Sequence, residues 1–206
     1  MNQNKQIGLL SLPVFVAALG YFVDVYDLLL FTIVRQTSVM SIGSTAETII
    51  VDSAHIINWQ MSGLLIGGIL WGVLGDKKGR LKVLFGSILL YSVANILTSF
   101  VQNVDQYAYC RFIGGIGLAG ELGAGITLVS EILPKHKRGI GTSMVAGIGL
   151  FGAVFAYFTF KYTNDWRLCY QIGGVLGFFL LILRVKVAES FMFESVKLSK
   201  LAKGNF

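Results

Sequence analysis

The sequence has little of what a soluble enzyme uses for its chemistry. Its 206 residues include only 2 prolines, 2 cysteines and 2 histidines, and only 14% of them are charged. Cys110 and Cys169 form neither a disulfide framework nor a metal-ligand spacing, and both fall in expected helices. There is also no paired nucleophile and base, phosphate-binding loop or metal cluster. We therefore expect a protein that is not an enzyme and uses no cofactor and no metal.

Hydrophobic residues make up most of what is present. They account for 54% of the chain, and the mean hydropathy is +0.70. A soluble domain of this length could not bury so much apolar surface. The 25 glycines suit membrane helices, where small residues allow backbones to approach closely. The first apolar run is too long for a signal peptide and follows only Lys5, so we expect it to remain as a signal anchor. The composition predicts an all-α membrane protein.

Six apolar runs reach the roughly 20 residues that a helix needs to cross a bilayer. We expect six transmembrane helices at residues 9–34, 54–75, 81–101, 106–133, 139–160 and 166–185. They would form one bundle over residues 1–186. Residues 35–53 are too rich in Ser, Thr and Gly to be a span. Residues 187–206 are expected to be a cytoplasmic amphipathic tail at the membrane surface or the start of a linker.

The basic residues predict the orientation of these helices. If the N-terminus is inside, 13 of the 17 Lys and Arg residues face the same side. These are Lys5, Lys77, Lys78, Arg80, Lys82, Lys135, Lys137, Arg138, Arg184, Lys186, Lys197, Lys200 and Lys203. Arg35, Lys161 and Arg167 face the other side, so the positive-inside rule places both termini in the cytoplasm. Anionic membrane lipids explain the net charge of +6, and no nucleic acid is expected as a partner.

Three carboxylates lie within the predicted spans, where a charge is costly and marks a candidate functional site. Asp24 and Asp27 are three residues apart and share one face of the first helix. We expect this face to point at a cavity whose other wall this chain does not supply. Glu121 and Asp24 both lie roughly 15 residues into their helices, which places both near the membrane midplane. Arg111 lies about 15 Å nearer the outside on the helix that carries Glu121.

These residues are candidates for proton coupling or substrate binding. Proton coupling needs a carboxyl group that exchanges its proton near the working pH. Asp24 and Glu121 are the first choices and Asp27 the next. The alternative for Asp27 is a structural ion pair with Arg111, and Tyr26 is either a substrate contact or a core residue. Four amide residues are candidates to line a cavity, namely Asn58, Gln60, Asn95 and Gln171.

A second pattern covers residues 72–82, between the second and third helices. Its glycines permit a tight turn, and Asp76 would be stabilised at the start of the third helix by the helix dipole. Arg80 can reach a carboxylate on a neighbouring helix, for which Glu131 is the candidate. The Gly72, Asp76, Gly79 and Arg80 spacing resembles the loop signature of the major facilitator superfamily.

The fourth helix strengthens this resemblance. Arg111 is followed by a glycine series and Glu121, then by Ser130, Glu131 and Arg138. This order is similar to the sugar, phosphate and metabolite:proton symporter branches of the superfamily, although Ala119 replaces a usual glycine. The resemblance implies a proton-coupled secondary transporter that works by alternating access, with loop residues Gly72, Asp76, Gly79, Arg80, Glu131 and Arg138 in gating.

Members of this superfamily have two six-helix halves, arranged around 3+3 inverted repeats. Six helices therefore predict half a transporter, which is a fragment, a separately encoded half or one protomer of a homodimer. A bacterial inner membrane and a small solute are expected, with some preference for an anion because of the pattern in the first helix and Arg111. The alternative is a non-transporting accessory or structural subunit of a membrane complex. A scaffold has little reason to keep three carboxylates at lipid depth.

Overall fold

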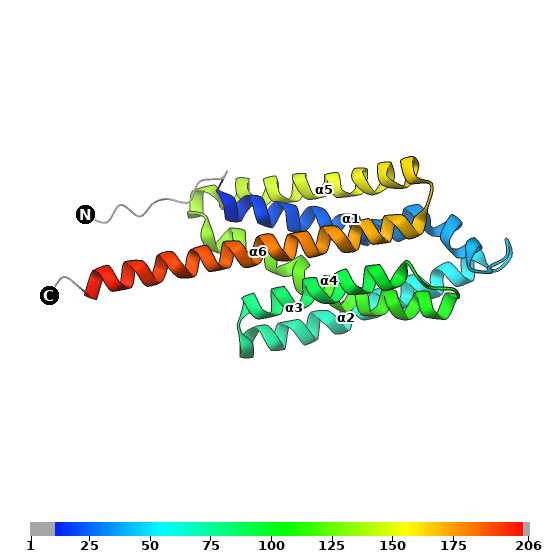
Figure 1. Cartoon of the computed structure of the whole chain (residues 1–206), viewed down its shortest axis with the longest axis horizontal. Helices are drawn as coiled ribbons and strands as arrows, with labels where there is room; N and C mark the ends of the chain where they lie inside the picture. Colours follow the sequence, from blue (N-terminus) through cyan, green and yellow to red (C-terminus); the bar gives the residue numbers. More distant parts are fainter. Residues whose placement is uncertain (1–10, 204–206) are drawn as a thin grey trace.

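The computed structural model describes residues 11–203, except for the side chains of residues 78, 80–81, 122–129, 131–132 and 188–203. Long helices account for nearly all of the described chain, and they lie side by side in one elongated bundle (Figure 1). They are α1 (Leu12–Ser41), α2 (Ile49–Lys78), α3 (Arg80–Thr98), α4 (Val104–Ile132), α5 (Arg138–Thr163) and α6 (Trp166–Lys203), with a 3-10 turn at Lys135–Lys137. The described part contains no β-strand, as an all-α membrane protein requires.

Four stretches are long and apolar enough to cross a membrane. They are Leu12–Ser41, Ile49–Lys77, Lys135–Thr163 and Trp166–Val187. Helix α3 contains a shorter apolar segment, Lys82–Thr98. The chain therefore has the helices of a multi-pass integral membrane protein.

Helices α1 and α4 lie at the centre of the bundle. The most extensive contacts are those of α2 with α4 and of α1 with α5, while α3 packs against both α4 and α6. The first three helices and the last three make equivalent contacts. When α1, α2 and α3 are matched in order with α4, α5 and α6, the α1–α5 contact corresponds to the α4–α2 contact. This is the packing pattern expected of two three-helix repeats, and it brings the two charge-bearing helices together.

Several predicted helix boundaries are wrong at the bundle ends. Helix α1 continues to Ser41 and α2 begins at Ile49, so part of the polar stretch 35–53 is helical. Helices α2 and α3 are joined through a single residue, Gly79, whose φ of +90° suits glycine. Asp76 consequently lies in the last turn of α2 rather than at the start of α3, where the dipole would have favoured it.

The predicted tail is also different in form. Helix α6 runs without a break from Trp166 to Lys203 and extends beyond the other helices (Figure 1). The segment after residue 187 is therefore a continuation of α6, not a separate helix along the membrane surface. Its amphipathic character depends on residues 188–203, whose side chains are outside the described part.

Glycines allow α2 and α4 to touch through their backbones. An added Cβ at Gly63 would collide with the Phe112 carbonyl of α4, and one at Gly115 would collide with the Gln60 carbonyl of α2. In contrast, an added Cβ at Gly68, also on α2, would meet nothing within 4 Å. Close backbone approach through small residues is a main source of helix association in membranes.

This contrast predicts the outcome of two otherwise identical substitutions. We expect Gly63→Ala to lower the melting temperature of the purified protein, because a backbone carbonyl cannot move aside as a side chain can. Gly68→Ala should leave it unchanged or raise it slightly, since alanine favours a helix over glycine by about 1 kcal/mol. Thermal unfolding in detergent measures both. Equal effects of the two substitutions would contradict the assigned α2–α4 contact.

Candidate functional site

Five charged side chains are buried among the residues whose exposure the structure describes. They are Asp24, Asp27, Arg111, Glu121 and Arg184, each no more than 5% exposed. Three helices carry them: α1 has two, α4 has two and α6 has one. A charge inside a membrane protein needs a partner, and so the pairing of these five groups defines the site.

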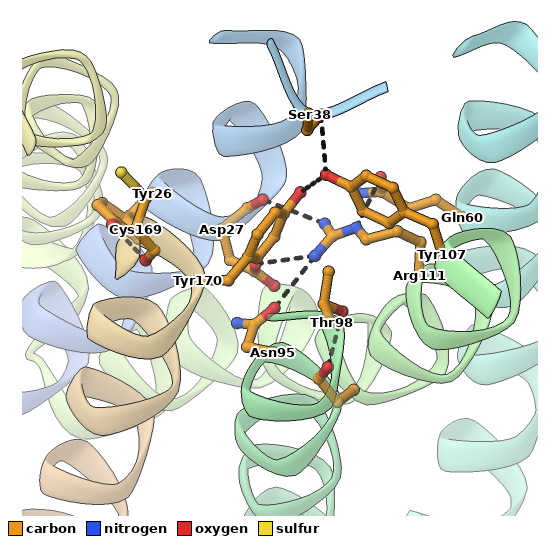
Figure 2. Close-up of polar contacts among 11 residues, drawn as sticks. Tyr26, Asp27, Ser38, Gln60, Asn95, Thr98, Tyr107, Arg111, Cys169 and Tyr170 are labelled. Atoms are coloured by element: carbon orange, nitrogen blue, oxygen red, sulfur yellow. Dashed lines mark hydrogen bonds and ion pairs between the residues drawn. The ribbon is translucent and has the colours of Figure 1, made fainter. Parts of the chain in front are cut away.

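Arg111 is the centre of the first group of contacts (Figure 2). Its Nη1 donates to Asp27 Oδ1 and to Asn95 Oδ1, both at 3.1 Å, and its Nη2 donates to the Asp27 carbonyl at 3.2 Å. Its Nε donates to Gln60 Oε1 at 3.4 Å, and its guanidinium lies 5.3 Å from the centre of the Tyr170 ring. One guanidinium thus connects α4 to α1, α2, α3 and α6, which uses the fixed fork of donors that arginine provides.

Aromatic residues enclose this group. The Tyr107 hydroxyl donates to the Tyr170 hydroxyl at 2.9 Å and lies 3.4 Å from Ser38 Oγ. Tyr26 is fully buried, and its hydroxyl donates to the Cys169 carbonyl at 2.8 Å (Figure 2). The structure therefore gives Tyr26 a position in the core between α1 and α6. Of the two roles predicted for Tyr26, a core residue or a substrate contact, its buried position favours the core residue.

Glu121 and Arg184 form the second group. Arg184 Nη2 lies 2.6 Å from Glu121 Oε1, and both side chains are buried. Gly20 of α1 makes room for the pair, because an added Cβ there would overlap the Arg184 guanidinium and approach Glu121 Oε1. Helices α4 and α6 are thus joined by a buried ion pair that packs directly against the backbone of α1.

Asp24 is the carboxylate without a partner. It is 1% exposed, and neither of its oxygens makes a hydrogen bond within the part of the chain that the structure describes. It lies within electrostatic range of Glu121, Arg184 and Asp27. Since Arg111 neutralises Asp27 and Arg184 neutralises Glu121, the buried cluster contains one carboxylate more than it has arginines.

Two predictions about these residues need correction. Asp24 and Asp27 do not point at a cavity that lacks a wall, because they are 1% and 0% exposed in this chain alone. Arg111 of α4 bonds Asp27, and Glu121 of α4 and Arg184 of α6 lie near Asp24. Arg184 was counted with the basic residues that set the orientation, yet it is buried against Glu121. It is the charged site residue that the sequence alone did not identify, because basic residues are ordinary near the end of a span.

The loop pattern is less completely described. Gly72, Asp76 and Gly79 are exposed at the α2–α3 end of the bundle. The Nε of Arg138 donates to the Leu133 carbonyl at 3.0 Å and so satisfies a backbone acceptor just beyond the end of α4. The expected Arg80–Glu131 contact depends on two side chains that lie outside the described part.

A bundle of long apolar helices with paired charges between its central members is an architecture of membrane transporters. The chain belongs to the Major Facilitator Superfamily, whose profile matches residues 8–203. It is 31% identical over 179 residues to the niacin transporter NiaP of Acinetobacter baylyi, covering 85% of this chain and 40% of that protein. It is 30% identical over 205 residues to the putative niacin/nicotinamide transporter NiaP of Bacillus subtilis, covering 97% and 48%.

Other relatives agree on the class. The chain is 32% identical over 146 residues to the 4-hydroxybenzoate transporter PcaK of Pseudomonas putida, covering 69% of this chain and 33% of that protein. The fold matches the xylose transporter XylE from E. coli in a partially occluded inward-open conformation. That match has a TM-score of 0.74 at 19% identity and covers 85% of this chain and 49% of XylE. This chain corresponds to the N-terminal half of such a transporter, and it spans about half the length of its relatives or less.

Proposed function

We propose that this chain is the N-terminal half of a proton-coupled symporter for a small organic anion. In this proposal all six helices span a bacterial inner membrane, with both termini in the cytoplasm. The observation that carries it is Asp24, the buried carboxylate with no partner. The other candidates, Asp27, Arg111 and Glu121, are assigned as the groups that surround and hold the proton site.

The proposal rests on the energy of an unpaired charge. Ionised Asp24 would be surrounded by apolar side chains and two ion pairs that are already neutral, at a cost of several kcal/mol. A proton removes this cost. Binding and release of that proton change the net charge between α1, α4 and α6 by one unit. This change would bias the packing of the three helices and so the side to which the transporter opens.

A second six-helix half completes the transporter in this proposal. Large apolar side chains remain exposed along α2 and α5. Leu65 is 70% exposed, Ile69 is 66%, Leu150 is 64% and Phe151 is 65%. Lipid and the second half would cover these surfaces. Since the charged residues are enclosed by this chain, the substrate would bind between the halves and the proton within this one.

The relatives guide the choice of substrate. Two of them are named for niacin and one for 4-hydroxybenzoate, and both compounds are small aromatic carboxylic acids. A carboxylate substrate that enters together with a proton carries no net charge across the membrane. Niacin and 4-hydroxybenzoate are therefore the first two probes for uptake.

Replacement of Asp24 by asparagine tests the proposal. In proteoliposomes that contain the complete transporter, we expect Asp24→Asn to abolish pH-driven accumulation of radiolabelled niacin or 4-hydroxybenzoate. Counterflow exchange at equal pH should persist, because asparagine resembles the protonated carboxyl. The matched control is Glu47→Gln, an exposed carboxylate in the α1–α2 connection.

The assignment of Asp24 fails if Asp24→Asn accumulates either probe as the unmodified protein does. If the unmodified protein neither accumulates nor exchanges either compound and co-purifies with a larger membrane complex, the accessory-subunit alternative is supported instead. Glu121→Gln is expected to impair uptake as well, with an added loss of stability because it leaves Arg184 unpaired.

A further inference from the structure

Tyr91 of α3 lies in the core of the bundle next to the charged cluster. It is 0% exposed and belongs to an apolar cluster that includes Val23, Leu118 and Leu180. Each of these neighbours is close in sequence to a buried charge: Val23 precedes Asp24, and the other two lie one helical turn before Glu121 and Arg184. The packing thus brings Tyr91 to the position where α1, α4 and α6 meet.

Glycines on two helices hold Tyr91 in this place. An added Cβ at Gly117 of α4 would collide with the Tyr91 backbone nitrogen and Cβ. An added Cβ at Gly177 of α6 would lie 2.9 Å from the Tyr91 ring. The close approach of both helices leaves the ring little freedom, so its hydroxyl has a fixed location.

The surroundings of this hydroxyl are unusual. No hydrogen bond of good geometry joins it to a residue in the described part of the chain, although the Glu121 carboxylate lies within reach of the hydroxyl. Four charged groups lie within its electrostatic range: Asp24 and Asp27 of α1, Glu121 of α4 and Arg184 of α6. The other fully buried tyrosines differ in this respect, because Tyr26, Tyr107 and Tyr170 all have hydrogen-bond partners. A buried tyrosine hydroxyl without a partner is rare and needs an explanation.

We propose that Tyr91 is a positioning residue of the proton site, whose hydroxyl donates to whichever of Asp24 and Glu121 is ionised. This inference rests on the proposed proton coupling. When Asp24 holds the proton, the hydroxyl donates to Glu121 and strengthens that end of the Glu121–Arg184 pair. When Asp24 releases its proton, the hydroxyl donates to Asp24 and supplies the partner it otherwise lacks. Tyr91 keeps its own proton throughout.

The test measures the carboxyl proton directly. In the complete transporter reconstituted in lipid, infrared difference spectroscopy follows the protonated carboxyl band as the pH is changed. Glu121 keeps Arg184 as a partner without the hydroxyl, whereas ionised Asp24 would be left with none, so the loss of the hydroxyl costs the ionised form of Asp24 more than the protonated form. Tyr91→Phe should therefore move the midpoint of this band upward by about one pH unit. The pH profile of uptake should move in the same direction, with uptake retained at its new optimum.

Tyr107→Phe is the matched control. It removes the same atom from an equally buried tyrosine, whose hydroxyl bonds Tyr170 instead of a carboxylate. Its band midpoint should equal that of the unmodified protein even if its stability is lower. An unchanged midpoint in Tyr91→Phe, or an equal shift in Tyr107→Phe, would overturn the inference.

One further variant covers the case in which Tyr91→Phe fails to fold. If Tyr91→Phe does not yield folded protein, fluorotyrosine at position 91 retains the shape and donates more strongly, so the midpoint should move to lower pH. An unchanged midpoint in that protein also overturns the inference. The infrared titration needs no substrate, and it therefore distinguishes a failure of the Tyr91 assignment from a failure of the proposed transport.

Discussion

Replacement of Arg184 by glutamine is expected to destabilise the protein more than any exposed substitution. Glu121 would then be an ionised side chain inside the bundle with no cation in contact. Breaking a buried pair by removing one partner costs about 3–5 kcal/mol. The melting temperature of the complete protein in detergent should fall sharply, and pH-driven uptake should be lost with it.

A second substitution, at Glu121, distinguishes the effect of the unpaired charge on stability from the effect of altered packing. In the double variant Arg184→Gln with Glu121→Gln no charge remains unpaired, so most of the lost stability should return. Proton-driven uptake should stay impaired because Glu121 is part of the proposed proton site. Lys186→Gln serves as the control, since Lys186 is exposed two residues away on the same helix. A double variant as unstable as the single one would show that the pair contributes through shape alone.

Arg111→Lys is the second substitution for which we expect a large effect. Lysine keeps the positive charge but has three donors at one point, whereas Arg111 makes four hydrogen bonds from three nitrogens. Asn95 and Gln60 would lose their partners, and α2 and α3 would lose their polar contacts to the centre. We expect about 2–4 kcal/mol of lost stability from the unsatisfied buried groups. Thermal unfolding measures this, with the exposed Arg35→Lys as the control.

The result for Arg111→Lys distinguishes two roles for this residue. If Arg111 served only to neutralise Asp27, lysine would replace it and stability would be retained. Arg111→Gln should be worse than Arg111→Lys in either case, because it leaves the buried Asp27 carboxylate unpaired. Equal stability of Arg111→Lys and the unmodified protein would contradict the role of Arg111 as the connection among five helices.

Asp24 is expected to behave in the opposite way from the two paired carboxylates. Asp24→Asn removes a charge that has no partner, so it should retain or raise the melting temperature even where it abolishes proton coupling. Loss of function without loss of stability indicates a residue that is needed for its chemistry rather than for the fold. The same buried site therefore contains residues whose removal affects the fold and one whose removal affects only transport.

Much of the site was accessible from the sequence because charges are rare in apolar runs. Asp24, Asp27, Arg111 and Glu121 each stand out for that reason, and the predicted Asp27–Arg111 ion pair is present. Arg184 did not stand out, since it lies near the end of a span where basic residues are ordinary. Gln60 and Asn95 were among four amide candidates to line a cavity, but their contact with Arg111 could not be predicted because neutral polar side chains occur on any face of a helix. Tyr91 gave no signal of its own for the same reason.

Helix ends were predicted less well than helix existence. The apolar runs show which part of a helix lies in lipid. The helix itself continues beyond the bilayer wherever its residues permit helical backbone angles. That is how α1 reaches Ser41 and α6 continues to Lys203. The sequence predicts a turn that includes Gly79. Only the backbone angles in the structure show that this one residue joins α2 and α3.

The sequence by itself determined the membrane class, the all-helical architecture and the presence of ionisable groups at membrane depth. These follow from local properties, namely hydropathy, length and the cost of a charge in lipid. Only the tertiary structure decided which carboxylate has a cation and which has none, because that depends on how helices far apart in the chain are rotated and packed. Gly20, Gly117 and Gly177 set that packing, and through it they leave Asp24 alone beside two completed ion pairs.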